Sequence, residues 1–163
     1  MSSNFYIIDT SSLIELNKHN PRDVYPGPWN KIELLIKNDR LVAPKEVFNE
    51  IKEIDDSLSR WAKKQSKFFI PPNPRQIEIV KDILKEFPSL IKISGTYDAD
   101  PWVIALAIEL AKDPQKRLLT IKRIVVTEEK IRGNRVKIPF VCENYNIEAI
   151  DIIDMFRTEG WRF

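Results

Sequence analysis

The feature that most constrains the fold is a pair of short, fully apolar runs that lie far apart in the sequence. The runs cover residues 5–8 and 124–126 and contain only Phe, Tyr, Ile and Val. Runs of this length without polar residues are typical of strands that are buried on both faces of a parallel sheet. Carboxylates follow both runs: Asp9 comes directly after the first, and Glu128 and Glu129 come after the second and one threonine. We therefore expect a central parallel sheet with acidic residues at its carboxyl edge.

The segments between these runs have the residue spacing of helices. Apolar residues recur at helical intervals over 29–37 and 77–87, and Asp100 begins a strongly apolar segment that ends near residue 111. Further helices are expected over 44–54, 58–67 and 152–157, and further strands over 41–43 and 147–150. Strands that alternate with helices favour a three-layer α/β/α fold, with helices on both faces of a mainly parallel sheet. Because no repeat or shift in composition marks a boundary, residues 1–163 are expected to form a single domain.

The scarcity of histidine and cysteine limits the chemistry. Cys142 is the only cysteine, which excludes a disulfide within the chain, and His19 is the only histidine, so a zinc site would need mostly carboxylate ligands. A Ser-His-Asp triad would have to use His19, which lies in a polar stretch, 17–21, that is expected to be a loop. A net charge of +2 does not by itself indicate nucleic-acid binding.

We also expect no association with a membrane. No segment approaches the roughly 18 apolar residues that a membrane-spanning helix needs. The residues before the first apolar run, Met1 to Asn4, lack the basic segment of a secretory signal. The sequence therefore predicts a cytoplasmic protein.

Acidic residues at the ends and flanks of the predicted elements are the candidate site. Asp9 ends a buried strand, and Asp100 begins a helix that is apolar almost all round and so is expected to lie centrally. Glu50 lies on a helix flank beside the core. Each acid also has a structural explanation: Asp9 and Asp100 suit helix N-caps, and Glu50 suits a solvated boundary position. The residues taken one by one leave both explanations open.

The order and spacing of these acids resemble the motifs of the PIN-domain ribonuclease family. Asp9-Thr10-Ser11 after an apolar strand is similar to the first motif, and the segment 47–51 around Glu50 is similar to the helical glutamate motif. Asp100 before an alanine-containing apolar helix resembles the third motif. The segment 125–129 resembles the fourth, in which family members usually carry Thr-x-Asp. Here Thr127 is followed by Glu128 and Glu129, so the chain departs from the family at the fourth acid.

The resemblance covers residues 5 to about 130, and it implies both a fold and an activity. Residues 137–142 and 156–161 are further similar to an uncharacterised prokaryotic subfamily of PIN-like proteins. The implied fold is a three-layer α/β/α PIN-like fold. The implied activity is that of a metal-dependent endoribonuclease, which hydrolyses RNA phosphodiester bonds at an acidic site. The implied cofactor is Mg²⁺ or Mn²⁺, since carboxylate oxygens prefer hard cations. Whether one or two ions bind stays open.

The family motifs assign roles to particular residues of this sequence. The implied catalytic residues, each carrying a carboxylate, are Asp9, Glu50, Asp100 and Glu129. The implied metal ligands are the same four and Glu128, and the choice between Glu128 and Glu129 as the fourth acid stays open, with Glu129 favoured. The implied supporting residues, of which Ser11 would orient Asp9, are Thr10, Ser11, Asp98 and Thr127.

The substrate and partners are predicted from charge and from the resemblance. Residues 112–137 hold nine Lys or Arg against three acids, and this excess flanks the fourth motif. The expected RNA-binding residues are Lys116, Arg117, Lys122, Arg123, Arg132 and Arg135. A solvated basic surface is the alternative interpretation. Because the resemblance is to toxins of the VapC type, it also implies an antitoxin protein as a partner, and a homodimer is a further expected assembly.

Two other functions share some of these features. A phosphatase of the haloacid-dehalogenase type also begins with an apolar strand and an Asp, but it needs a second Asp two residues later, where this chain has Ser11. The stronger alternative is a catalytically inactive PIN-like module that binds RNA or a protein. Retention of the acid set, apart from Glu in place of Asp at the fourth position, favours the enzyme.

Overall fold

A parallel sheet lies at the centre of the computed structural model, which describes residues 4–91, 98–111, 121–133 and 135–163. Within these residues the strands are β1 (Asn4–Ile8), β2 (Leu41–Pro44), β3 (Phe69–Ile70), β4 (Lys122–Val126) and β5 (Glu148–Ile150). Their order is β3-β2-β1-β4-β5, and every pairing is parallel. The first strand is therefore the middle one, and Ile8 at its end is paired with Val126 at the end of β4.

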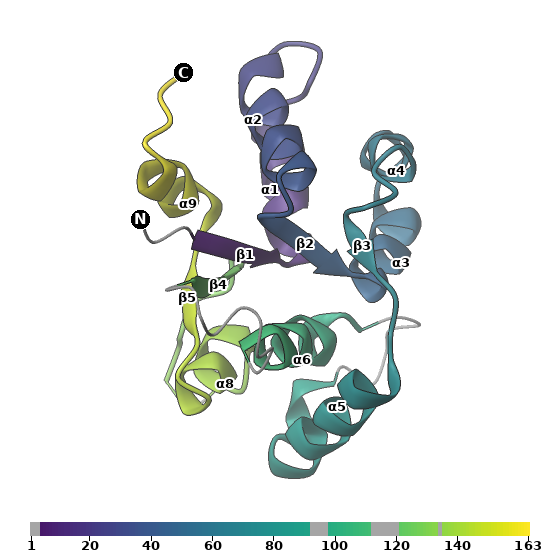
Figure 1. Cartoon of the computed structure of the whole chain (residues 1–163), viewed down its shortest axis with the longest axis vertical. Helices are drawn as coiled ribbons and strands as arrows, with labels where there is room; N and C mark the ends of the chain where they lie inside the picture. Colours follow the sequence, from purple (N-terminus) through teal and green to yellow (C-terminus); the bar gives the residue numbers. More distant parts are fainter. Residues whose placement is uncertain (1–3, 92–97, 112–120, 134) are drawn as a thin grey trace.

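Helices cover both faces of this sheet (Figure 1). One side carries α1 (Thr10–His19), α2 (Pro26–Lys37), α3 (Lys45–Ile54), α4 (Asp56–Lys63) and α9 (Ile152–Glu159). The other side carries α5 (Pro74–Glu86), α6 (Asp100–Ala111) and α8 (Ile138–Asn144), and a short 3₁₀ helix, η1 (Pro88–Leu90), follows α5. The expected three-layer α/β/α fold is confirmed. None of the helices in the described part of the chain has both the length and the apolar character needed to cross a membrane.

The position of α6 follows from its composition. Val103, Ile104 and Ala105 are fully buried, and the helix packs against β1, β2 and β4. Because α6 leads into β4, which is parallel to β1, it runs back across the sheet and begins at the carboxyl edge. The Val103 N–H donates to the Ala99 carbonyl, so Asp100 lies in the first turn of α6, one residue after the N-cap position that the sequence predicts for it.

Some elements differ from the sequence predictions, and the differences have physical reasons. His19 was expected in a loop, but it belongs to the last turn of α1, where its Nε2 lies 3.0 Å from a Glu15 carboxylate oxygen one turn earlier. The edge strand β3 was missed because two residues are too short to show alternation. The helix α8 was also missed, although Pro139 in its first turn is a typical start signal.

A polar network at the amino edge of the sheet ties the chain ends together. Both guanidinium Nη atoms of Arg40, which precedes β2, lie 2.8 Å from the carboxylate oxygens of Glu159 at the end of α9. The Tyr6 hydroxyl on β1 donates to the same carboxylate at 2.7 Å. The Glu159 side chain is only 10% exposed, so these partners replace the water that would otherwise solvate its carboxylate.

We predict that Arg40→Met lowers the free energy of unfolding by about 2 kcal/mol, because it leaves the Glu159 carboxylate without its cationic partner. Urea denaturation monitored by circular dichroism measures the change. Lys81→Met is the matched control, since Lys81 forms an exposed ion pair with Glu78 and should matter by no more than about 0.5 kcal/mol. Equal effects of the two variants would show that the Arg40 network does not stabilise the fold.

Candidate active site

The Asp9 side chain is the centre of the candidate site. The Asp9 N–H donates to the Val126 carbonyl at 2.8 Å, which extends the pairing of β1 with β4 by one residue. Its side chain is 3% exposed, and Oδ2 accepts hydrogen bonds from the hydroxyls of Ser11 (2.8 Å) and Thr127 (3.1 Å). Asp9 occupies the N-cap position of α1 but makes no side-chain cap hydrogen bond. Helix capping therefore does not account for its carboxylate.

A second carboxylate approaches from α3. The Thr10 hydroxyl donates to Glu50 Oε1 at 2.6 Å, which joins the first residue of α1 to the middle of α3. Burial raises the pKa of Glu50, and the charges of Asp9 and Asp98 raise it further, while hydrogen bonds from Thr10 and from the Ala99 backbone lower it. Glu50 is therefore close to both the end of β1 and the segment before α6.

The start of α6 contributes two more acids to the same edge. Asp100 is 9% exposed and lies in the first turn of α6. Its N–H donates to Asp98 Oδ1 at 3.2 Å. The Asp98 charge contributes to the raised pKa of Glu50. Asp98 therefore lies beside Glu50, and Asp100 is bonded to Asp98 at the start of α6. Neither position could be derived from the sequence without knowing the direction of α6.

The two glutamates after β4 point to different neighbours. Glu129 Oε2 accepts a hydrogen bond from the Ile138 N–H at the start of α8, at 3.0 Å, and the Glu129 charge raises the pKa of Asp9. Glu128 turns toward α9, where its Oε2 accepts from the Ile152 N–H at 3.3 Å. Burial raises the pKa of Glu128, and its charged neighbours are on α1 and around α9 rather than at Asp9. Glu129 is therefore the glutamate that lies beside Asp9.

Burial and like charge together perturb the central acid. Burial is the largest cause that raises the pKa of Asp9, and the Glu129 charge adds to it. Hydrogen bonds from Ser11, Thr127 and the Thr10 backbone oppose the rise. The charges that raise the pKa of Asp9 and Glu50 all come from other carboxylates. Such clustering costs stability unless a proton or a cation compensates it.

The oxygen-only donor set suits a hard cation such as Mg²⁺ or Mn²⁺. Within the described residues, however, no three acidic, histidine or cysteine side chains are close enough together to hold a metal ion. Coordination by Asp9, Glu50 and Glu129 together would therefore require their side chains to move toward one another. The nearby Cys142 is fully buried, and burial together with the charges of Asp9 and Glu129 raises its pKa to about 12, so it stays a neutral thiol.

The structure separates the predicted basic residues into groups. Arg132 and Arg135 line a cavity of about 310 Å³ together with Ser11, Glu128 and Glu129. Lys137, which belongs to the basic stretch 112–137, lines it too, as does Lys130, which was not singled out from the sequence. The excess of basic residues around the fourth motif is the sequence feature that could have identified these two lysines.

Two of the other basic candidates do not line this cavity. Lys122 and Arg123 lie at the amino end of β4, where Lys122 forms an ion pair with Glu148, so the structure does not bring them to the acidic edge. Lys116 and Arg117 lie outside the described residues.

Comparisons with known proteins agree with this geometry at the level of the fold. The chain is similar to the crystal structure of VapBC2 from Rickettsia felis bound to a DNA fragment from their promoter, with 14% sequence identity and a TM-score of 0.50. The match covers 90% of this chain and 98% of that chain. The expected PIN-like fold is thus confirmed. A family model described as Domain of unknown function (DUF4411) matches residues 6–163, so the chain belongs to that family. No curated protein matches the chain.

We predict that Asp9→Asn makes the metal-free protein at least as stable as the wild type, with an advantage that grows with pH. Below 3.8, the ordinary pKa of Asp, the group is protonated in both the folded and the unfolded state. As pH rises from there to the raised pKa of the folded state, Asp9 ionises in the unfolded state but stays largely protonated in the folded state. The free energy of unfolding of the wild type therefore falls over this range. Thermal melts in EDTA across this pH range measure the difference. A large destabilisation at neutral pH would show that the carboxylate is structural.

Asp151→Asn provides a control with the opposite sign. Although burial opposes the change, hydrogen bonds from the Asp154 N–H and from Lys130 hold the pKa of Asp151 below its ordinary value. That contribution to stability is present at neutral pH and is lost as pH falls through the lowered pKa. The Asp151 variant should therefore be less stable than the wild type at neutral pH, and the difference should shrink in acid.

Proposed function

We propose that this protein is a metal-dependent endoribonuclease that hydrolyses RNA phosphodiester bonds at the carboxyl edge of its sheet. The observation that carries the proposal is the repulsion of Asp9 with Glu50 and of Asp9 with Glu129, since the three residues come from separate segments of the chain. Carboxylates packed together at the expense of stability are characteristic of functional sites. The confirmed PIN-like fold and the order of the acids along the chain support the same conclusion.

Asp9, Asp100 and Glu129 would hold the cation, and Glu50 would bind it directly or through water. A bound Mg²⁺ or Mn²⁺ lowers the pKa of a water molecule and stabilises charge on the phosphate. Because burial and repulsion favour the protonated forms of Asp9 and Glu50, the cation must compete with protons for these side chains. Cation binding should therefore strengthen as pH rises.

Neighbouring hydrogen bonds restrict the proposed ligands, which would still have to move toward one another to share a cation. Ser11 and Thr127 both donate to Oδ2 of Asp9, which leaves Oδ1 free of them for the cation. The Ile138 N–H holds Oε2 of Glu129 in the same way. The Thr10 hydroxyl fixes Glu50. Such contacts reduce the side-chain freedom that is lost when the substrate and cation bind.

The cavity beside Glu129 suits the RNA backbone. Arg132 and Arg135 are exposed side chains that line it, and Glu129, one of the proposed cation ligands, lines the same cavity. Guanidinium groups bind phosphate oxygens in pairs of hydrogen bonds, so these arginines would hold a phosphate near the carboxylates. We propose that the protein acts as the toxin of a toxin–antitoxin pair, in which case a small antitoxin protein would cover this face.

The second candidate function is a PIN-like module that binds RNA or a protein without cleaving it. The specific observation in its favour is that no three potential ligands in the described residues form a ready metal-binding group. Glu129 in place of the family's Asp points the same way. A metal-dependent cleavage assay separates the two functions.

We predict that Asp9→Asn or Asp100→Asn lowers RNA cleavage in Mn²⁺ by about 10²-fold, the scale expected when a major electrostatic contributor is removed. RNA binding, measured separately in Ca²⁺, should change little, because these side chains act on the cation rather than on the RNA. Cleavage of structured RNA by the purified protein is the measurement. Wild-type rates from both variants would assign any activity to a contaminant and favour the binding module.

Glu129→Gln and Glu128→Gln form a matched pair for the same assay. They carry the same chemical change at adjacent positions, but only Glu129 lies beside Asp9. The Glu129 variant should therefore lose activity while the Glu128 variant keeps most of it. The reverse result would move the fourth ligand to Glu128.

We predict that Arg132→Ala with Arg135→Ala weakens RNA binding and makes it less dependent on salt. The slope of log K against log salt should fall by about 0.7 for every phosphate of a single strand that the two arginines neutralise in the wild type. Binding titrations at several salt concentrations measure the slope. Lys122→Ala is the control, because its ammonium group is paired with Glu148 at the other end of β4. An unchanged slope in the double variant would place the RNA elsewhere.

A further inference from the structure

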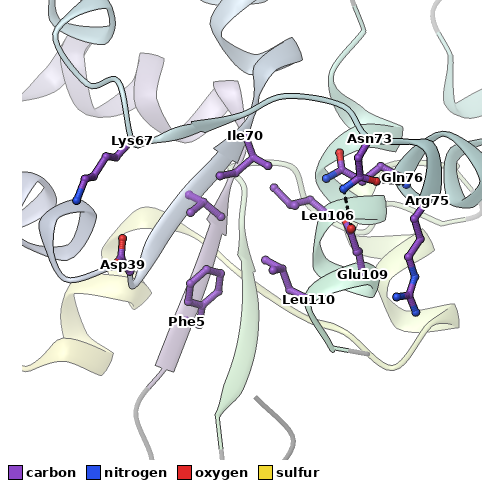
Figure 2. Close-up of a pocket in the computed structure, with 11 residues that line it drawn as sticks. Phe5, Asp39, Lys67, Ile70, Asn73, Arg75, Gln76, Leu106, Glu109 and Leu110 are labelled. Carbon is purple, nitrogen blue, oxygen red and sulfur yellow. Dashed lines mark hydrogen bonds between the residues drawn. The ribbon is translucent and has the colours of Figure 1, made fainter. Parts of the chain in front are cut away.

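A second cavity on the described surface lies away from the acidic site. It has a volume of about 640 Å³, within the range of about 300–1,000 Å³ typical of small-molecule sites. Figure 2 shows it between the sheet and two helices, with Phe5 on the sheet side and Leu106 and Leu110 on the helix side. Phe5 is near the amino end of β1, and these leucines are in the second half of α6. The cavity therefore opens toward the edge of the sheet opposite to Asp9.

An unsatisfied amide lies in the wall of this cavity. Gln76 is 1% exposed, and neither its Oε1 nor its Nε2 has a hydrogen-bond partner among the described residues. Its backbone N–H is satisfied, because it donates to Asn73 Oδ1 at 2.8 Å. A buried amide with neither group paired is unfavourable in a folded protein, and native structures rarely retain one without a role.

The polar side chains at the start of α5 are paired with groups other than the Gln76 amide. Asn73 caps α5 through Oδ1, and its Nδ2 donates to Glu109 Oε1 on α6 at 2.7 Å (Figure 2). This pair joins α5 to α6 and leaves the Gln76 amide out of the hydrogen bonding. Because Gln76 itself lines the cavity, rotation about its side-chain torsions would present the amide to a bound molecule.

We propose that this cavity binds the adenine ring of a free nucleoside or nucleotide. A glutamine amide offers one donor and one acceptor side by side, and it pairs with the N6 and N7 edge of adenine. The aromatic ring of Phe5 and the leucines of α6 provide apolar walls for a flat ring. Lys67 and Arg75, which are exposed and lie on the cavity wall, provide cations for a phosphate. The proposal is independent of the nuclease function.

Isothermal titration calorimetry of the full chain with adenosine and adenosine monophosphate tests the proposal. Both should bind, and tighter binding of the monophosphate would show that Lys67 or Arg75 contacts the phosphate. Guanosine should bind more weakly, because its O6 and N7 are both acceptors and leave the Gln76 acceptor unpaired. Ribose 5-phosphate, which has no base, should not bind. Equal binding of ribose 5-phosphate would overturn recognition of the base.

Two variants make the test specific to this cavity. Gln76→Met keeps the length of the side chain and removes the amide, so it should weaken adenosine binding by about tenfold or more without lowering the melting temperature. Leu110→Trp should abolish binding, because the larger side chain at this half-buried position would fill part of the cavity. Gln65→Met is the matched control, since Gln65 does not line the cavity, and it should bind like the wild type. Absence of binding at millimolar ligand, or wild-type affinity in both cavity variants, would refute the proposal.

Discussion

The burial of Asp9 at the end of the central strand is the constraint on which the rest of the site depends. A carboxylate that is 3% exposed is stable there only with compensation, and the hydroxyls of Ser11 and Thr127 supply part of it. Thr127 also accepts from the Glu129 N–H, and Ser11 accepts from the Glu128 N–H. The same two hydroxyls thus hold the central acid and the chain that follows β4. A single buried carboxyl group therefore organises both strand ends.

The second determinant is the apolar helix α6, which contributes to both edges of the sheet. Its first turn carries Asp100 at the acidic edge, and its last turn carries Glu109 and Leu110 in the wall of the other cavity. The helix packs against three strands on one face of the sheet. A shift of either end would therefore disturb the packing of the core.

The local patterns of the sequence predicted most of the fold. The apolar runs of β1 and β4, the alternation of strands and helices, and the start of α6 near Asp100 agree with the structure within a residue or two. Patterns failed where an element was short or where a polar stretch continued a helix, as at β3 and His19. Two residues carry no period, and a polar last turn is stabilised by its neighbours along the helix rather than by burial.

The sequence by itself determined which acids were available, because carboxylates after buried strands and before a buried helix are recognisable from composition and order. Only the tertiary structure decided which of them meet. Glu128 and Glu129 are adjacent and chemically identical, yet they bind different helix N-termini. The Ile152 N–H of α9 donates to Glu128, and the Ile138 N–H of α8 donates to Glu129. The positions of these helices depend on how they pack against the sheet. In the same way, the pairing of β4 with β1 places Lys122 opposite Asn4, at the edge of the sheet away from Asp9. Distances between side chains depend on how elements pack, and the spacing along the chain contains no information about that packing.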